Sequence, residues 1–423
     1  MDTLQGTSNV SNNKSLKSSW KLWRFDQMAT NVNVRIDNPS ESGMEHYVGL
    51  EHLDADSMKV RRWGTPDDVE ATKLMFKKGD IIFGRRRAYQ RKLGVAAFDG
   101  ICSAHAMVLR AKPDVVLPEF LPFFMQSDLF MNRAVEISVG SLSPTVNWKT
   151  LAAQRFALPP INEQERLLTL FSAMDHGCNE FSEALSAAEA LFESSLWNWT
   201  TGRLASKKRP IEAGEWSKAR LPGINEIPVT WRLVRLTDVA RLESGHTPSR
   251  RHEDYWSGDI PWISLGDTER LDTRRIVETA ETVSQKGIDN SSARLLPRDT
   301  VVLCRTASVG FCSVMDKPMS TSQDFANFVC DTNAVLPDFL YFLFRAMRKY
   351  WKKIAMGGGI KTVYMPFFKE MQIALPPIEE QESIIVGLSS IQDAVSDLRG
   401  RLTGSRSLLS HVRDQALGVQ HEL

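Results

Sequence analysis

The sequence predicts a duplicated α+β protein in which two globular domains alternate with two long helices. The clearest sign of duplication is a repeated nonapeptide. Ala157–Glu165 reads ALPPINEQE and Ala374–Glu382 reads ALPPIEEQE, with eight of nine positions identical. A helical heptad pattern follows each nonapeptide, and a polar, basic linker separates the copies. These observations predict the order globule, helix, linker, globule, helix. The two globule-and-helix copies are expected to be related by a pseudo-twofold axis.

The repeat extends upstream of the nonapeptides. At the same offset of 217, Gly140, Thr145 and Val146 match Gly357, Thr362 and Val363. Farther upstream the register shifts slightly, but LPEFLPFF at 117–124 still resembles LPDFLYFL at 336–343, and KKGDIIFGR at 77–85 resembles PRDTVVLCR at 297–305. A colinear series of matching blocks indicates a tandem duplication with units of about 200 residues.

The long helices are expected over Glu163–Trp199 and Glu380–Leu417, after double prolines that suit helix entry. Their apolar residues recur at alternating steps of four and three, which is typical of coiled coils. In the first helix these are Leu167, Phe171, Met174, Cys178, Phe181, Leu185, Ala188 and Phe192; in the second, Ile384, Leu388, Ile391, Val395, Leu398, Leu402, Ser405 and Leu409, with Ser405 the polar exception. Because the seams match at the repeat offset, we expect the helices to pack together. The alternative is two unrelated amphipathic helices, each packed on its own domain.

The domain boundaries follow from these patterns. We expect an N-terminal mobile tail (1–18), a globular domain (19–158), a spacer helix (159–205), a linker (206–224), a second globular domain (225–375) and a second spacer helix (376–423). Within each globule, β-rich runs such as Asp80–Phe83 and Thr300–Cys304 alternate with helical segments such as Glu119–Met131 and Asp338–Met347. Each globule is therefore expected to be α+β.

Composition limits the class of protein. Hydrophobic residues make up 42% and charged residues 24%, a balance typical of globular proteins. The net charge of +1 does not by itself indicate a nucleic-acid binder, so any DNA contact must come from local patches or from a basic partner. Five cysteines without a CxxC pair suit reduced thiols in the cytoplasm. We expect neither a membrane span nor a secretion signal.

No pattern of catalytic residues emerges. The sequence has no NPPY-type tetrapeptide, GxxxxGK[ST] loop or HExxH motif. Asp67 and Glu70 lie too close together for the usual two-strand nuclease site. Cys304, Cys312 and Cys330 are expected to be buried thiols, not metal ligands. The sequence therefore indicates a binding protein without a cofactor or metal of its own.

A basic run in the first globule is the strongest candidate for DNA contact. It reads RRRAYQRK and directly follows the β-like run at Asp80–Phe83, so we expect it at a strand end or in a loop. Arginine and lysine can pair with phosphates, and arginine and glutamine can also bond to base edges. The candidate residues are Arg85, Arg86, Arg87, Tyr89, Gln90, Arg91 and Lys92. The alternative is a solvated basic loop.

The corresponding place in the second globule, Arg305–Phe311, is less charged. Compensating candidates come from the segments HTPSRRH and KTVY. Together with Arg305, the candidate DNA-contacting residues of the second globule are Thr247, Ser249, Arg250, Arg251, Lys361 and Tyr364. Trp256 and Trp262 could stack on bases, but packing in the core is the favoured interpretation.

These segments resemble the specificity subunits of Type I restriction–modification systems. GHTPSRRHEDYWSGDIPWISLGD, RDTVVLCRTASVG and ALPPIEEQESII look like a target-recognition domain and its spacer helix, and SVGSLSPTVNWKTLAAQRFALPPINEQERL looks like the end of another. The resemblance covers residues 20–423. The second copy opens with the usual pattern, IPVTWRLVRLTDVA, whereas in SWKLWRFDQMATNV of the first copy it is barely visible.

The resemblance implies that each globule reads one half of a bipartite site in double-stranded DNA. The two helices would pair antiparallel and set the gap between the half-sites. Two methyltransferase subunits would dock on this non-catalytic chain and motor–nuclease subunits would join them, with the S-adenosylmethionine, ATP and Mg chemistry in those partners. Two alternatives stay open: the recognition module of a related system with a fused methyltransferase–nuclease, and a coiled-coil adaptor that never touches DNA.

Overall fold

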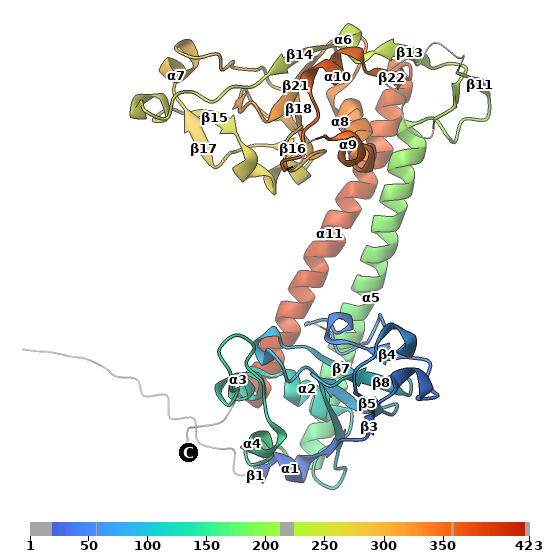
Figure 1. Ribbon diagram of the computed structural model, residues 1–423, viewed down its shortest axis with the longest axis vertical. Helices are drawn as coiled ribbons and strands as arrows, with labels where there is room; N and C mark the ends of the chain where they lie inside the picture. Colours follow the sequence, from blue (N-terminus) through green and yellow to red (C-terminus); the bar gives the residue numbers. More distant parts are fainter. Residues whose placement is uncertain (1–18, 56, 212–223, 357–358, 419–423) are drawn as a thin grey trace, which may run out of the picture. The chain divides into compact units, whose positions relative to one another are not determined.

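The computed structural model describes residues 19–55, 57–211, 224–356 and 359–418 (Figure 1). The chain forms two compact units. Unit 1 comprises residues 1–183 with 399–423, and unit 2 comprises residues 184–398. The predicted tail, residues 1–18, lies outside the described residues.

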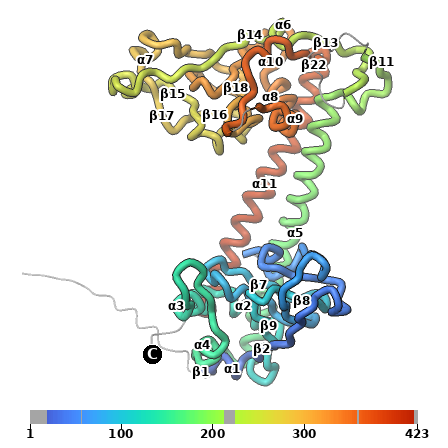
Figure 2. The backbone as a smooth tube through the Cα atoms, in the orientation of Figure 1, coloured from blue at the N-terminus to red at the C-terminus, as the bar shows by residue number. Residues whose placement is uncertain are grey.

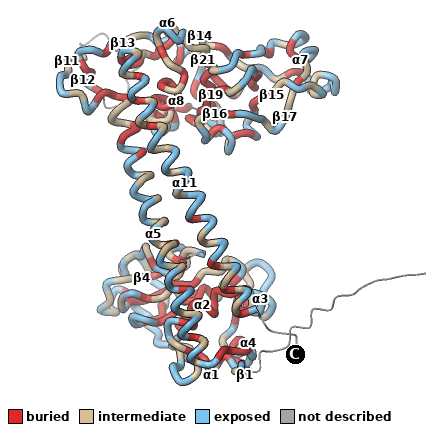
Figure 3. Tube along the Cα trace, turned by 180° about the vertical axis from the view of Figure 1, so that it is seen from behind, coloured by how far each residue is buried: buried red, intermediate tan, exposed pale blue. Residues whose placement is uncertain are grey.

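The two long helices are α5 (Ile161–Thr200) and α11 (Ile378–Leu417). Each begins two residues before its predicted start, directly after the double proline, and the predicted helices are confirmed. Because the unit boundaries fall within both helices, each unit contains one segment of α5 and one of α11. The predicted seam positions are all buried or half-buried, including Ser405. Figure 3 shows buried and intermediate positions alternating with exposed ones along both helices.

The two helices pack antiparallel within each unit. In unit 2, Leu196 of α5 shares a core with Leu388 of α11, and the ring of Trp199 lies against Gly387. In unit 1, Cys178 of α5 and Leu409 of α11 line the same small cavity. The earlier residue of α5 thus pairs with the later residue of α11, so the chain directions are opposite. The coiled coil is the correct interpretation, and two independent amphipathic helices are not.

Unit 1 is built on two four-stranded sheets and a separate strand pair. Figure 2 traces the backbone path of the unit along the sequence. One sheet has the order β2 (Ala29–Val32), β9 (Met107–Ala111), β6 (Ile81–Phe83), β7 (Leu93–Val95); the other has β3 (Arg35–Ile36), β5 (Lys73–Phe76), β8 (Gly100–Ser103), β4 (Tyr47–Val48). Strand β1 (Lys21–Arg24) pairs with β10 (Arg155–Leu158) just before α5. The shorter helices are α1 (Phe25–Met28), α2 (Phe120–Gln126), α3 (Asp128–Glu136) and α4 (Trp148–Ala152), with single 3-10 turns at Pro39–Glu41, Leu50–His52, Pro66–Asp68 and Ala88–Gln90.

The single helix predicted at Glu119–Met131 is wrong, because the segment forms two helices, α2 and α3. Ser127 separates them with extended backbone, and its hydroxyl accepts a hydrogen bond from the backbone of Phe130 at 3.4 Å. Serine is a favoured N-cap residue because its side chain satisfies a free N–H of the first turn. The break therefore follows from capping, which competes with the apolar periodicity across the segment.

Unit 2 contains a five-stranded sheet with the order β14 (Ala240–Ser244), β21 (Phe325–Cys330), β18 (Val301–Cys304), β19 (Cys312–Met315), β16 (Arg275–Ile276). A second sheet has the order β17 (Glu281–Val283), β15 (Ile260–Ile263), β20 (Ser320–Thr321), and β13 (Arg232–Arg235) pairs with β22 (Gln372–Leu375). The helices are α6 (Leu236–Val239), α7 (Gln285–Asp289), α8 (Pro337–Ala346), α9 (Arg348–Ile354) and α10 (Met365–Glu370), with 3-10 turns at Glu253–Tyr255, Leu265–Asp267 and Arg270–Asp272. The β-rich run and helix predicted here correspond to β18 and α8.

The two units open in the same way although their opening sequences differ. Trp20 and Trp231 are both buried, and each stands directly before a strand that pairs with the strand leading into a long helix. A short helix and a sheet strand follow in both units: α1 and β2 in unit 1, α6 and β14 in unit 2. The structure thus establishes the start of the first globule, which the sequence pattern left indistinct.

The linker contains regular structure in its described part. Strand β11 (Lys208–Pro210) pairs antiparallel with β12 (Glu226–Pro228), whereas residues 212–223 lie outside the described residues. The five cysteines are free, and burial raises the pKa of the Cys304 and Cys312 thiols to about 12. Within the described ranges no helix has the length and apolarity that a bilayer crossing requires.

Candidate nucleic-acid interface

The predicted basic run forms a loop that is bonded to a second loop of unit 1. We call residues 84–92, directly after β6, the arginine loop, and residues 139–145 the hairpin loop. The hairpin loop is closed by two backbone hydrogen bonds between Val139 and Thr145, at 3.1 and 3.0 Å. The arginine loop is bonded to the hairpin loop and to the residue that follows it: the Arg87 N–H donates to the Pro144 carbonyl at 2.7 Å, and the Arg85 carbonyl accepts from the N–H of Val146 at 2.9 Å. Segments about 60 residues apart in sequence therefore form one backbone framework.

Two arginines of the run reach across to the hairpin loop. Arg86 Nη2 and Arg87 Nη2 donate to the Ser143 hydroxyl at 3.2 and 3.3 Å. Arg86 Nη1 also lies 3.1 Å from His105 Nε2. Burial, followed by the charges of Arg86, Arg85 and Lys73, lowers the pKa of His105. A neutral imidazole can accept the hydrogen bond from Arg86. The bonds to Ser143 position both guanidinium groups beside the hairpin loop.

Three other cations of the run are bonded inside unit 1. Arg85 Nη2 donates to the Ala104 carbonyl at 3.2 Å and Lys92 Nζ to the Leu50 carbonyl at 2.7 Å. Arg91 donates to Asp128 at 2.7 Å and to the Gln126 carbonyl at 2.6 Å. These bonds hold the loop in place and use part of the hydrogen-bonding capacity of the three side chains. Tyr89 is exposed and Gln90 half-buried, which leaves Arg86, Arg87 and Tyr89 as the best-placed candidates of the run.

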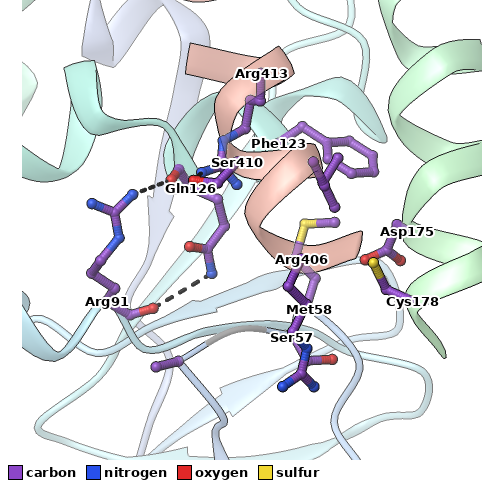
Figure 4. Close-up of a pocket in the computed structure, with 12 residues that line it drawn as sticks. Ser57, Met58, Arg91, Phe123, Gln126, Asp175, Cys178, Arg406, Ser410 and Arg413 are labelled. Carbon is purple, nitrogen blue, oxygen red and sulfur yellow. Dashed lines mark hydrogen bonds between the residues drawn. The ribbon is translucent and has the colours of Figure 1, made fainter. Parts of the chain in front are cut away.

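Arg91 belongs to the contact between the end of α11 and the rest of unit 1 (Figure 4). It lines a cavity of about 90 Å³ together with Gln126 and the buried Arg413. The Asp128 N–H donates to Asp414 Oδ1 at 2.8 Å, and Asp414 lies 3.5 Å from Arg413 Nη2. The arginines at this contact thus have carboxylate partners close by, which indicates a structural role.

Unit 2 contains the same framework with different side chains. The Arg305 carbonyl accepts from the Val363 N–H at 2.8 Å, and the Ala307 N–H donates to the Lys361 carbonyl at 3.0 Å. Met356 and Thr362 close the counterpart hairpin with bonds of 3.0 and 2.8 Å; residues 357 and 358 within it lie outside the described residues. Ala307 has a φ of 58°, the same left-handed value as Arg87. The backbone is kept while the side chain at this position changes from arginine to alanine.

Four of the predicted residues of unit 2 gather around this framework. Arg305 Nη2 donates to the Gln323 carbonyl at 2.6 Å, and the Thr247 hydroxyl donates to Gln323 Oε1 at 2.6 Å. Lys361 lies in the hairpin and Tyr364 just after it, and both are exposed. Arg305 therefore resembles Arg85 in holding the loop, whereas Lys361 and Tyr364 are available for a ligand.

Arg250 is engaged elsewhere in unit 2. Its guanidinium pairs with both carboxylate oxygens of Glu281, at 2.5 and 2.9 Å, and lies 3.5 Å from the ring centre of Trp256. The hydrogen bond with Glu281 raises the pKa of Arg250 and lowers that of Glu281. Ser249 and Arg251 beside it are exposed. Trp256 packs edge-on against the buried Trp262, so the preference for core packing over base stacking is supported for this pair.

Sequence reasoning missed the apolar residues of the hairpin loops. Leu142 is 91% exposed and Val139 is also exposed, and the counterpart hairpin exposes Met356 and Ile360. The signal was present in the sequence, because large apolar residues interrupt the Gly- and Ser-rich segments VGSLSPT and MGGGIKT at the repeat offset. Exposure, however, can only be judged from the folded loops.

Comparison with known proteins identifies the family. The model for the type I restriction modification DNA specificity domain matches residues 66–188 and 228–402, more than half of the chain. The MjaIX specificity subunit of Methanocaldococcus jannaschii is 30% identical over 176 residues, which are 41% of this chain and 40% of that protein. The HindI specificity subunit of Haemophilus influenzae is 21% identical, with 93% of this chain and 98% of that protein aligned.

The fold agrees with this assignment. A chain from a study of complex assembly and conformational transition in a type I restriction–modification system superposes with a TM-score of 0.57 at 20% identity, covering 97% of this chain and all of that one. The two matched regions also fall one in each repeat of the sequence. The chain is a member of the type I restriction–modification specificity-subunit family.

Proposed function

We propose that this chain is the DNA-recognition subunit of a type I restriction–modification complex, in which each unit reads one half of a bipartite target. The observation that carries the proposal is the shared framework of the two units. Arg85 and Arg305 make equivalent backbone and side-chain bonds, whereas Arg86 and Arg87 are replaced by Thr306 and Ala307. One scaffold with different exposed side chains suits two related domains that recognise different base sequences.

In unit 1 the guanidinium groups of Arg87, which is exposed, and of Arg86, which is half-buried, suit DNA. Arginine bonds bidentately to phosphate oxygens and to the O6 and N7 atoms of guanine. Arg86 and Arg87 donate to a neutral hydroxyl, that of Ser143, and within the described part of the chain neither pairs with a carboxylate, so their charges are not cancelled there. In unit 2, Lys361 and Tyr364 are the counterparts proposed to contact DNA. The weaker charge of this set predicts that unit 1 contributes more of the salt-dependent affinity.

The long helices are proposed to act as the spacer between half-sites. Each has 40 residues, a length of about 60 Å at ~1.5 Å per residue. A helix pair with a continuous apolar seam is stiff along its axis, because each turn of one helix packs against the other. Such a spacer fixes a base-pair gap better than a flexible linker does.

Two methyltransferase subunits are proposed to dock on the helices. Leu191 of α5 and Leu408 of α11 occupy equivalent positions at the repeat offset and are 56% and 55% exposed. Large apolar side chains that remain exposed at equivalent positions suit two identical partners bound about the pseudo-twofold. S-adenosylmethionine, ATP and Mg would be bound by the methyltransferase and motor–nuclease subunits, and this chain would contribute no catalytic group.

The test is to express the chain with the methyltransferase encoded beside it and to map methylated adenines in the host DNA. We expect one bipartite motif whose two halves differ in sequence. Cells with the methyltransferase alone are the control and should lack the motif. A contiguous motif, or methylation that does not depend on this chain, would contradict the proposal.

A further inference from the structure

We propose that Leu142, at the tip of the hairpin loop, makes an apolar contact with the DNA bases of the half-site that unit 1 reads. The inference rests on the proposed function, because it assumes that unit 1 binds DNA. Leu142 would then contribute to base recognition beside Arg86 and Arg87, through an apolar contact.

The loop that carries Leu142 is fixed at both ends. Val139 and Thr145 pair through two backbone bonds, and the Thr145 hydroxyl donates to the Ser143 carbonyl at 3.1 Å. Gly140 has a φ of 117°, a conformation that glycine adopts with little strain. The arginine loop binds the next residues through the Pro144 carbonyl and the Val146 N–H. Since its base is held in this way, the tip is presented in a defined position.

The side chain of Leu142 is left for a partner to cover. Burying a leucine side chain is favourable, and at 91% exposure almost none of that gain is realised in the free chain. Single exposed apolar residues are common on protein surfaces. Here, however, Val139 of the same loop is exposed as well, and Met356 and Ile360 are exposed on the counterpart hairpin of unit 2. At the repeat offset Val139 matches Met356, whereas Leu142 falls opposite Gly359 and Ile360 opposite Ser143. Both hairpins therefore expose large apolar side chains, at partly different positions.

The neighbours of Leu142 indicate that the partner is DNA. Ser143 next to it accepts hydrogen bonds from Arg86 and Arg87, so two guanidinium groups lie beside the loop tip. An apolar protein surface would gain little from these cations, whereas phosphates on either side of a groove would pair with them. Apolar side chains read DNA either against the thymine methyl group or between base steps. Both contacts require cations that bring the backbone close.

The experiment compares three variants of the chain, each assembled with the methyltransferase and scored on a randomised target library. Leu142→Ser removes the apolar contact, and Leu142→Met retains one of similar size. Val34→Ser, at a 51% exposed valine in another loop of unit 1, is the matched control. We expect Leu142→Ser to lose discrimination at one position of one half-site by roughly five- to 150-fold, the range of a base contact worth about 1–3 kcal/mol. Leu142→Met and Val34→Ser should keep the motif.

The outcomes separate this inference from the proposed function. If Leu142→Ser reads the same motif with the same affinity as the unaltered chain, Leu142 is not a base contact and the inference is wrong. The proposed function survives that result, because the motif itself is still read. If neither the variants nor the unaltered chain select any sequence from the library, the proposed function is wrong, and the inference is wrong with it. Since Leu142 has almost no contacts to lose, unchanged melting temperatures should accompany every result.

Discussion

Gln164 and Gln381 make the same three hydrogen bonds in the two units. Each Oε1 accepts from a backbone N–H, of Leu117 at 2.9 Å and of Leu336 at 2.8 Å. Each Nε2 donates to two backbone carbonyls, one of which belongs to the first proline of the double proline before the helix. Both side chains are buried. The glutamine of the repeated nonapeptide therefore ties the start of each long helix to the loop that precedes α2 or α8.

We expect Gln164→Met to destabilise unit 1. The change leaves buried backbone groups, including the Leu117 N–H and the Val115 carbonyl, without their partner, at about 1–3 kcal/mol for each unsatisfied group. Urea unfolding of the full chain measures the effect. Gln415→Met, at an exposed position of α11, is the control and should change the free energy of unfolding by less than about 0.5 kcal/mol. Equal stability of the two variants would contradict the structural role.

The sequence predicted the long helices to within two residues because their signal is carried by forty consecutive positions. It also predicted the duplicated order of elements, since matched blocks recur at one offset. It could not separate the roles of the cations in the arginine loop. Arg91 is bonded to Gln126 and Asp128, more than thirty residues away, and no local pattern announces those partners.

The break between α2 and α3 was missed, and the start of the first globule, expected at residue 19, was only weakly marked in the sequence. Ser127 stands within a run of apolar residues, and the helical period of that run predicted one continuous helix although serine is a favoured N-cap residue. At the start of unit 1, Trp20 and Trp231 share a buried position, and the strands after them read KLWR and RLVR, with the same leucine and arginine at two of the four positions. The matching segment is short, and a buried position constrains size and polarity more than identity, so the sequence pattern is weak there.

Arg87 and Arg91 should separate by phenotype. Arg87→Ala removes an exposed guanidinium, so we expect weaker DNA binding and a salt dependence reduced by about one counterion, with unchanged stability. Arg91→Ala removes the bonds to Asp128 and Gln126, so we expect a stability loss of about 1 kcal/mol and a smaller effect on DNA binding. Filter binding of the assembled complex at two salt concentrations, with urea unfolding, measures both. The reverse pattern would place the DNA face at Arg91.

His105 should make the stability of unit 1 depend on pH. Burial and the nearby arginines lower its pKa in the folded chain below the usual 6.5. A group with a lowered folded-state pKa stabilises the fold fully above its unfolded-state pKa and loses that contribution as pH falls through the folded-state pKa. We therefore expect stability to fall as pH drops below about 6.5. Between pH 7.5 and 5, the melting temperature should decline less for His105→Gln than for the unaltered chain. If the two melting temperatures fall in parallel, groups other than His105 cause the decline.

Leu191 and Leu408 should each support one methyltransferase subunit. Leu191→Asp and Leu408→Asp place a charge at the centre of the proposed contacts, so we expect each variant to bind one methyltransferase subunit and the double variant none. Analytical ultracentrifugation of the assembled complex gives the stoichiometry. Ala394→Asp, at another exposed position of α11, should leave two subunits bound. Two subunits on the double variant would show that the partners dock elsewhere.

The gap between half-sites should follow the length of the helix pair. An insertion near Trp199 would disturb its packing on Gly387, so the better position is the boundary between the units. One heptad inserted after Glu183 in α5 and another after Leu398 in α11 keeps the apolar seam in register in both helices. Seven residues add about 10.5 Å at ~1.5 Å per residue. At ~3.4 Å per base pair this corresponds to about three additional base pairs. We therefore expect the methylated motif to keep both half-sites and to widen its gap by about three base pairs.

A heptad in α5 alone should instead abolish methylation, because the seams no longer match. If the doubly extended chain kept the original gap while its half-site bases changed, the helices would not set the spacing.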